Sequence, residues 1–187
     1  MSWYEFLLFV HVLGAAAWLG SGILLVVLGA RLSRARESAG LKTLFDQAGW
    51  LSTRFFTPVS LVVLVAGLLL VWEGDWPWTA LWVEIGYLGF AATFVTGFFV
   101  LAPRAEKVAA IIERDGGVSA EANDGIRRLF VLMRLDYAIL AMVVADMTLK
   151  PTTDDVGVLV GMAAVVAIVG AVVLRTVRAP AAHAPSA

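Results

Sequence analysis

Long apolar segments alternate with short charged ones along the chain of 187 residues. A helix needs about 20 predominantly apolar residues to cross the hydrocarbon core of a bilayer. The segments that come near that length predict five transmembrane helices, at residues 3–30, 55–72, 80–102, 126–149 and 156–173. The pattern therefore predicts an all-α, polytopic membrane helix bundle. We expect one bundle over residues 1–178, followed by a disordered Ala- and Pro-rich tail at residues 179–187.

The connections between these segments differ in charge from one side to the other. The connections after the first, third and fifth spans are rich in Arg and Lys. They hold Arg31, Arg34, Arg36, Lys42, Arg54, Arg104, Lys107, Arg114, Arg127, Arg128, Arg175 and Arg178. The remaining two hold a single lysine, Lys150, among several acidic residues. Because Arg and Lys concentrate in cytoplasmic loops, we expect the N-terminus outside and the C-terminus in the cytoplasm.

Two of the predicted cytoplasmic connections also carry apolar residues at helical spacing. Leu41, Leu44, Phe45 and Ala48 predict that the first helix continues past the membrane and is followed by a short amphipathic helix on the membrane surface. Residues 105–114 show the same pattern and end at a Gly-Gly pair. The sequence thus predicts short interfacial helices on the cytoplasmic side.

The composition and the absent motifs exclude several classes of function but do not identify one. Hydrophobic residues make up 60% of the chain and charged residues 16%, against about 25% charged in a soluble domain. The absence of cysteine excludes disulfides and iron–sulfur clusters. No phosphate loop, zinc-protease motif or hydrolase elbow is present. We therefore favour a non-catalytic protein whose main partner is the lipid bilayer, without nucleic acid.

A histidine inside the first span is the clearest candidate functional residue. His11 is the only histidine in a predicted span, since the other, His183, lies in the tail. An ionisable side chain in the hydrocarbon marks a functional site by default. One ring nitrogen of His11 can bind a metal or haem iron, with Met142 or Met147 as a second ligand. Haem b and copper are the cofactors this pattern allows, although methionines also serve as plain packing residues.

Charged residues within or beside the spans predict a polar network in two layers. The outer layer comprises His11, Glu84, Asp146 and Lys150. Asp146 and Lys150 are four residues apart on one helix, so we expect them to pair. The alternatives are a histidine that is hydrogen-bonded to a backbone carbonyl or a carboxylate within the packed bundle, and acidic residues at hydrated helix ends.

The inner layer of this network lies near the cytoplasmic side. It comprises Arg54, Arg134 and Asp136. We expect Asp136 to pair with Arg54 across two helices, whereas Arg134 can extend to the lipid headgroups. A structural salt bridge is the simplest role for this layer. A Gly157-x-x-x-Gly161 pair in the last span leaves homodimer formation open, as well as membership of a larger membrane complex.

The motifs together resemble a family of bacterial integral-membrane proteins of unknown function over about residues 4–152. They are His11-x6-Trp18-x-Gly20, Arg54-x-x-x-Pro58 and Asp146-Met147-x-x-Lys150-Pro151. That family is distantly similar to the copper-resistance D proteins and to haem-binding membrane protoporphyrinogen oxidases. The likeness implies His11 as a haem-ligand position and a multi-pass location in the bacterial inner (cytoplasmic) membrane.

Three functions remain open from the sequence. The first is a membrane protein that binds haem or copper through His11 in an outward-facing cavity. The second is a small proton-coupled transporter that uses the acidic residues of both layers. The third is a structural subunit of a membrane complex, in which the polar residues serve helix packing.

Overall fold

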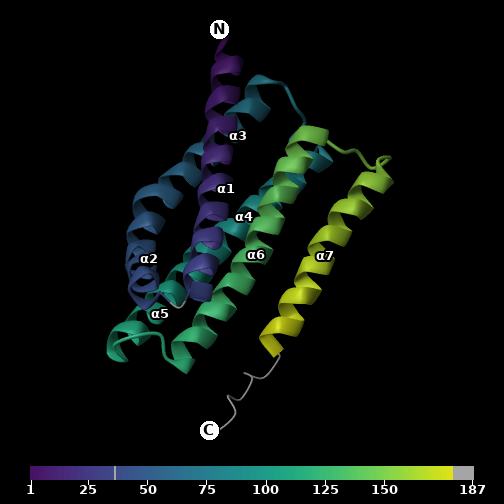
Figure 1. The fold of residues 1–187 in the computed structure, drawn as a ribbon. Coiled ribbons are helices and arrows are strands. Elements are labelled where there is room, and N and C mark those ends of the chain that lie inside the picture. Colours follow the sequence, from purple (N-terminus) through teal and green to yellow (C-terminus); the bar gives the residue numbers. More distant parts are fainter. Residues whose placement is uncertain (36, 179–187) are drawn as a thin grey trace.

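The described part of the chain, residues 1–35 and 37–178 of a computed structural model, is built from helices without strands. Two short segments, η1 and η2, are π-helical turns. In chain order the elements of Figure 1 are α1 (Trp3–Ala35), α2 (Ser38–Leu51), η1 (Ser52–Phe56), α3 (Thr57–Glu73), α4 (Leu81–Thr96), η2 (Gly97–Leu101), α5 (Ala102–Arg114), α6 (Ala120–Leu149) and α7 (Val156–Arg178). The predicted tail at residues 179–187 lies outside the described residues.

Four helical units in the described residues are long and apolar enough to cross a membrane. They are α1, the continuous helix Ser38–Glu73, the continuous helix Leu81–Arg114, and α7 as far as Thr176. The predicted fourth span falls within α6, which carries Arg134, Asp136 and Asp146 and packs against both α4 and α7 (Figure 1). The all-α polytopic membrane bundle is therefore confirmed, while the fifth crossing and the orientation stay predictions.

The predicted interfacial helices exist as helical segments, but they are not separate elements. α2 continues through η1 into α3, and α4 continues through η2 into α5, without an intervening loop. Nothing in either stretch ends the helix, because Pro58 and Pro103 lie in the first turns of α3 and α5. A proline inside a continuous helix removes a hydrogen bond and crowds the preceding turn, and a widened π-helical turn accommodates it.

A compact core forms at the end of the bundle where α2 and α5 pack against each other and against the first half of α6. Its buried side chains come from all three helices. They are Leu41, Phe45, Ala105, Val108, Ala109, Ile111, Ile112, Ala122, Ile126, Leu129 and Phe130. These are the apolar faces of the amphipathic segments that the sequence shows. The end of the bundle is thus closed by side-chain packing and not by loops.

Glycines on α1 allow neighbouring helices to approach closely. A Cβ atom at Gly22 would overlap the ring of Tyr137, and one at Gly29 would overlap the ring of Phe130. Both glycines are seven residues apart and receive aromatic rings from α6. Small residues at such crossings are the usual device for packing helices in membranes, where lipid is as apolar as the side chains.

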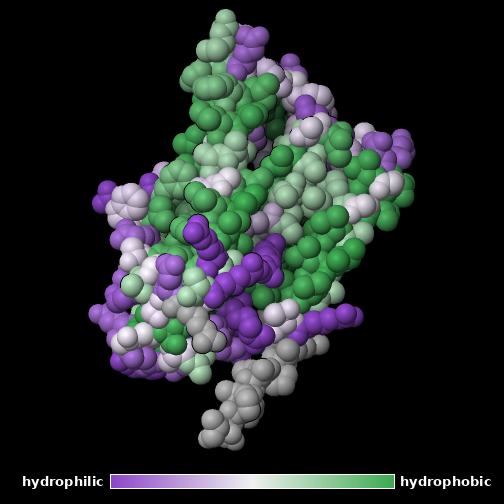
Figure 2. Space-filling view, viewed as in Figure 1, coloured by the Kyte–Doolittle hydropathy of each residue, from purple (hydrophilic) through white to green (hydrophobic). Residues whose placement is uncertain are grey.

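The outer surface of the bundle suits contact with lipid. Figure 2 shows hydrophobic residues along the lengths of the helices and many hydrophilic residues towards the end formed by α2 and α5. α7 lies at the edge and packs mainly on α6 (Figure 1). Cβ atoms at Gly157 and Gly161 would meet nothing within 4 Å. The glycine pair therefore has no partner helix among the described residues, and dimer formation stays a prediction.

Candidate functional site

A cavity of about 130 Å³ lies within the bundle, above the packed core of α2 and α5. Side chains from α1, α2, α3, α4, α5 and α6 line it, together with both π-helical turns. We call it the central cavity. Most of its lining is apolar, and its polar lining residues are Ser52, Thr57, Ser60, Thr93, Asp136 and Tyr137.

Asp136 is the polar group of the central cavity that lacks a partner. Its residue is only 6% exposed, and its Oδ1 atom has no hydrogen-bond partner among the described residues. Leaving a buried polar atom unsatisfied costs about 1–3 kcal/mol, and more for a charged group. A native protein therefore rarely keeps such an atom without a reason. The carboxyl group of Asp136 is the strongest candidate for contact with a ligand.

Two buried hydroxyl groups give the central cavity a consistent chemical character. Ser60 donates to the Thr57 carbonyl oxygen at 2.9 Å, and Thr93 donates to the Phe90 carbonyl oxygen at 3.1 Å. A hydroxyl has one donor hydrogen and two acceptor lone pairs. Because both hydrogens are used within the helices, these hydroxyls present acceptors to the cavity, as Asp136 does. The site thus matches a molecule that donates hydrogen bonds.

The two π-helical turns line the central cavity and have the same local sequence cause. Pro58 follows the last residue of η1 by two positions, and Pro103 follows the last residue of η2 by two positions. The hydroxyl of Thr57, the residue after η1, donates to the carbonyl oxygen of Ser52 at 2.8 Å, and the same oxygen accepts the Thr57 N–H across the widened turn. Single π-helical turns inside α-helices are frequent at functional sites.

A column of aromatic rings runs along α4 and η2, and its members Phe94 and Phe98 line the central cavity. Phe90 and Phe94 stack with ring centroids 5.8 Å apart, and Phe94 and Phe98 stack at 6.3 Å. Trp18 of α1 meets Phe90 edge-on at 5.6 Å. Such rings provide a broad, rigid apolar surface.

His11 lies elsewhere, at the contact between α1 and α3. Its Nδ1 atom is 2.9 Å from the Val63 carbonyl oxygen, and its ring lies over Gly67, where a Cβ atom would come within 3.0 Å of it. Because a carbonyl oxygen can only accept, Nδ1 carries the hydrogen in this contact. The Nε2 atom is then left as the acceptor or ligand atom, as in many metal-binding histidines.

The structure does not assemble a metal centre around His11. No group of three His, Asp or Glu side chains in the described part of the chain could hold a metal ion. Met147 packs its terminal methyl group against Gly86 of α4, which is a packing contact. Met142 is half-buried on α6. His11 therefore offers one possible metal ligand, its Nε2 atom. The other ligands of a metal centre would have to come from outside the described His, Asp and Glu residues.

The outer polar layer is rearranged relative to the prediction. Asp146 is completely buried, and neither of its carboxylate oxygens has a partner among the described residues. The ammonium of Lys150 instead lies 4.2 Å from the ring centroid of Trp76 and 4.9 Å from that of Trp82. The expected Asp146–Lys150 pair is thus wrong, because Lys150 ends α6 in the left-handed conformation (φ 47°), off the helical path. Glu84 is exposed.

The inner layer is also less connected than expected. Arg54 in η1 and Arg134 on α6 are both exposed, and Oδ1 of Asp136 has no partner in the described residues. The predicted Arg54–Asp136 salt bridge is therefore not formed. Long arginine side chains at this level can reach the headgroups, which leaves Asp136 alone in the cavity.

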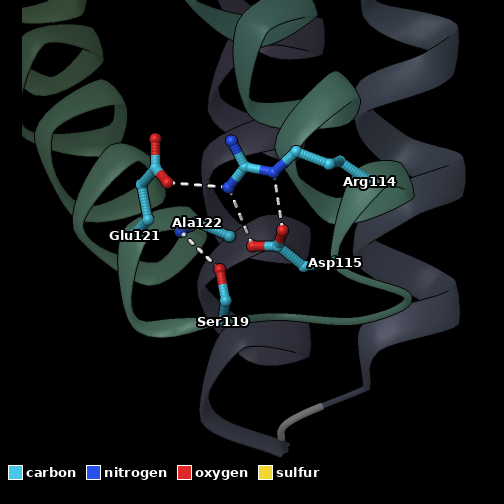
Figure 3. Close-up of polar contacts among 5 residues, drawn as sticks. All are labelled: Arg114, Asp115, Ser119, Glu121 and Ala122. Carbon is cyan, nitrogen blue, oxygen red and sulfur yellow. Dashed lines mark hydrogen bonds and ion pairs between the residues drawn. The ribbon is translucent and has the colours of Figure 1, made fainter.

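Ion pairs gather where the chain leaves the predicted membrane. Arg114 pairs with Asp115 and with Glu121 at 2.7 Å each, and Ser119 accepts the Ala122 N–H to cap α6 (Figure 3). The hydrogen bond from Arg114 lowers the pKa of Asp115 to about 2. These contacts hold the α5–α6 connection in place.

A second set of ion pairs lies within the first turns of α6. Arg127 and Arg128 pair with Asp124 at 2.9 and 2.7 Å, and they hold the pKa of Asp124 below its ordinary value. Arg127 also donates to the Thr176 carbonyl oxygen of α7 at 2.8 Å. Arg127 thus joins α6 to α7 through a hydrogen bond, while the ion pairs stay within α6.

Sequence reasoning placed Asp136 in a salt bridge and overlooked the central cavity. Ser60 and Thr93 carried a signal, since each is one of the few hydroxyl residues in an otherwise apolar span. The matching positions of Pro58 and Pro103 carried another. Neither signal shows which helices meet, so the cavity required the structure.

Comparison with known proteins supports the membrane assignment. A family model described as "Predicted integral membrane protein (DUF2269)" matches residues 5–151. No curated protein and no solved structure shows a significant match to the chain. The more distant likeness to copper-resistance D proteins and haem-binding oxidases finds no support in these comparisons. Since the match covers most of the chain, the chain belongs to this family of predicted integral membrane proteins of unknown function.

Proposed function

We propose that this membrane protein binds a lipid-soluble molecule in the central cavity and that the molecule donates a hydrogen bond to Asp136. Asp136 carries the proposal, because its residue is only 6% exposed, its Oδ1 atom has no partner among the described residues, and it lines an otherwise largely apolar cavity. Polar residues inside a membrane protein are expensive to bury and usually functional. A bound donor would remove the penalty of the missing hydrogen bond.

The remaining lining supports the same class of ligand. Ser60 and Thr93 present acceptor lone pairs beside Asp136, so an alcohol or amine fits better than a group that only accepts. The aromatic column of Phe94 and Phe98 suits an apolar body. Ligand sites of this kind combine apolar walls with a few polar groups that orient the ligand.

Fluorescence quenching of purified protein in lipid nanodiscs tests this proposal. Trp18 is 7% exposed and lines the central cavity, so a brominated ligand bound there quenches its emission. The probes are a brominated long-chain alcohol and its methyl ether, which cannot donate. We expect the alcohol to bind about tenfold more tightly or better, since the hydrogen bond is worth about 1.4 kcal/mol or more. A Trp18→Phe variant shows which part of the quenched emission comes from Trp18.

Two matched variants decide whether Asp136 is responsible. Asp136→Leu should abolish the preference for the alcohol, because the acceptor is gone. Asp146→Leu removes the other buried, unpartnered carboxyl of α6, which does not line the cavity, and should keep the preference. If leucine does not fit there, Asp146→Asn replaces it. Equal binding of alcohol and ether to the unaltered protein contradicts the proposal.

The second candidate function is attachment of haem or copper through His11. The observation in its favour is the 2.9 Å contact between Nδ1 and the Val63 carbonyl oxygen, which leaves Nε2 free to act as a ligand. A three-ligand metal centre does not fit the described residues. A cofactor would therefore depend on His11 as its histidine ligand and on further ligands from elsewhere.

Absorption spectra and metal analysis of detergent-purified protein test this second candidate. The comparison is the unaltered chain with His11→Ala and, as a control for adventitious binding, His183→Ala. A Soret band or stoichiometric copper that disappears only in His11→Ala supports it. A colourless, metal-free protein contradicts it and leaves His11 as a hydrogen bond between α1 and α3.

A further inference from the structure

We propose that the ligand reaches the central cavity sideways from the lipid, through a mouth between η1 and η2, and that it is a long-chain alcohol or amine whose chain stays in that mouth. This inference rests on the proposed function and adds the route and the shape of the ligand. Under the predicted orientation the mouth opens towards the cytoplasmic leaflet.

The volume of the cavity requires a ligand that extends beyond it. The central cavity measures about 130 Å³. Pockets that enclose a complete drug-sized ligand are about 300–1,000 Å³, whereas a cavity of about 150 Å³ holds one benzene ring. Only a head group or a single ring fits beside Asp136. The rest of a larger lipid-soluble molecule must pass out between helices.

The rim of the cavity shows where this passage lies. Phe98 lines the central cavity and is also 45% exposed, so its ring borders both the cavity and the surface. Gly97 lines the cavity too, and a Cβ atom there would meet nothing within 4 Å. Both residues belong to η2. The cavity therefore reaches the surface of the bundle at this turn.

The neighbouring elements leave the same side open. α3 packs closely with α1, and α4 packs closely with α6, but α3 and α4 barely touch each other. Below them α2 and α5 are packed together and close the cytoplasmic end. The open direction is thus lateral, between η1 on one side and η2 on the other, where lipid surrounds the bundle.

Apart from Ser52, the lining that η1 and η2 contribute is apolar, which favours an alkyl chain at the mouth. Phe56 of η1 and Phe94, Phe98 and Leu101 of η2 and α4 present apolar surface along it. The acceptors Asp136, Ser60 and Thr93 lie at the inner end. A molecule with one hydrogen-bond donor at the end of a long apolar chain satisfies both ends. A fatty acid fits less well, since its carboxylate would lie beside the carboxyl group of Asp136 and two hydroxyls whose hydrogens are already used.

A photochemical ruler on the nanodisc-embedded protein tests this arrangement. The probes are long-chain alcohols that carry a diazirine next to the hydroxyl, in mid-chain or at the far end, and the corresponding fatty acids. Labelled residues are mapped by mass spectrometry. We expect the diazirine nearest the hydroxyl to label α6 around Asp136, the mid-chain diazirine to label η1 and η2, and the far-end diazirine to label mainly lipid. The fatty acids should label at least tenfold less.

Variants at two open glycines test the route independently. Gly97→Leu fills the mouth and should reduce labelling of α6 at least fivefold. Gly161→Leu is the matched control, because Gly161 has equally open surroundings on α7 and does not line the cavity. If Gly97→Leu does not fold, the labelling pattern of the three diazirine positions in the unaltered protein still tests the lateral route.

Each outcome separates the route from the binding itself. Two outcomes overturn the lateral mouth while the binding proposal stands. The first is saturable labelling of α6 that does not depend on the position of the diazirine along the alkyl chain. The second is labelling of α6 that persists in folded Gly97→Leu. Labelling of α6 by fatty acid as strong as by alcohol overturns the ligand class. No saturable labelling of α6 by any probe overturns both proposals.

Discussion

α6 carries two buried carboxyl groups, and the bundle treats them differently. Asp136 lies in the half of the bundle near α2 and α5, where it lines the central cavity beside two hydroxyl groups. Asp146 lies in the opposite half, where it is completely buried and its Oδ2 atom is 3.9 Å from the position of a Cβ atom on Gly86. Both have oxygens without partners among the described residues.

The difference shows that burial without a partner does not by itself make a binding site. Asp136 has adjacent space, convergent acceptors and an apolar approach, whereas Asp146 is fully buried against Gly86, where the methyl group of Met147 also packs. A ligand needs volume next to the polar group that orients it. We therefore assign binding to the inner half and close packing to the outer half, and the following predictions test that contrast.

The largest expected difference concerns two glycines of the α4–η2 helix. Gly86→Leu should destabilise the protein by about 1–3 kcal/mol, because its side chain would overlap the Met147 methyl group and press on Asp146. Gly97→Leu should change stability by less than about 0.5 kcal/mol, since its surroundings are open. Unfolding of detergent-purified variants measures both. If Gly86→Leu is as stable as the unaltered protein, the outer half is not closely packed.

Replacement of each carboxyl group by leucine sharpens the contrast further. Asp136→Leu should stabilise ligand-free protein by about 1–3 kcal/mol, because it removes an unsatisfied buried oxygen and its side chain can extend into the cavity. Asp146→Leu should gain less, because the larger side chain has no adjacent space. The same unfolding measurement tests both variants. A strong loss of stability in Asp136→Leu means that its carboxyl group has a structural partner.

A smaller effect is expected at the outer end of α6. Lys150 and Trp82 should show a coupling of about 0.5–1 kcal/mol in a double-mutant cycle, as expected for an ammonium over an indole ring. Lys150 and Asp146 should show a smaller coupling, since no ion pair joins them. The cycles use Lys150→Met with Trp82→Leu and with Asp146→Asn. If the coupling between Lys150 and Asp146 is instead the larger of the two, the ion pair that the sequence predicted does form.

The helices and their approximate limits are predictable because their signal is local. Apolar length identifies the candidate spans, and Leu41 and Phe45 at helical spacing identify the amphipathic segment that packs at the end of the bundle. Continuity through η1 and η2 is harder to predict, because a proline is as compatible with a new helix as with a widened turn. Gly116 and Gly117, by contrast, mark the end of α5 correctly.

The polar contacts are less predictable because they depend on which faces of different helices meet. Spacing along α6 placed Asp146 and Lys150 on one face, but the left-handed backbone at Lys150 directs its ammonium to two tryptophans. A hydrogen bond from His11 to a backbone carbonyl was one of the expected alternatives and is the contact found, but no sequence motif identifies Val63 as the partner. The cavity beside Asp136 arises from six helices and two π-helical turns and has no local signature.

The ion-paired carboxylate of Asp115 is the reference for the unpaired carboxyl groups of Asp136 and Asp146. Its replacement should have the smallest effect on stability. Arg114 lowers the pKa of Asp115 from its ordinary 3.8 to about 2. The ionised form of Asp115 is thus favoured in the folded protein, so its contribution is complete above about pH 4 and is lost as the pH falls towards 2. Asp115→Asn should lower the unfolding temperature slightly near neutral pH, and the difference from the unaltered protein should vanish near pH 2.

The control for this last prediction is salt, because exposed ion pairs are screened. Raising the salt concentration to about 1 M should shrink the effect of Asp115→Asn, while the effects of Asp136→Leu and Asp146→Leu should persist. A difference between Asp115→Asn and the unaltered protein that stays constant from neutral pH to pH 2 contradicts the assigned ion pair. Strong salt dependence of Asp136→Leu would instead place its carboxyl group in contact with solvent ions, which its burial in the cavity excludes.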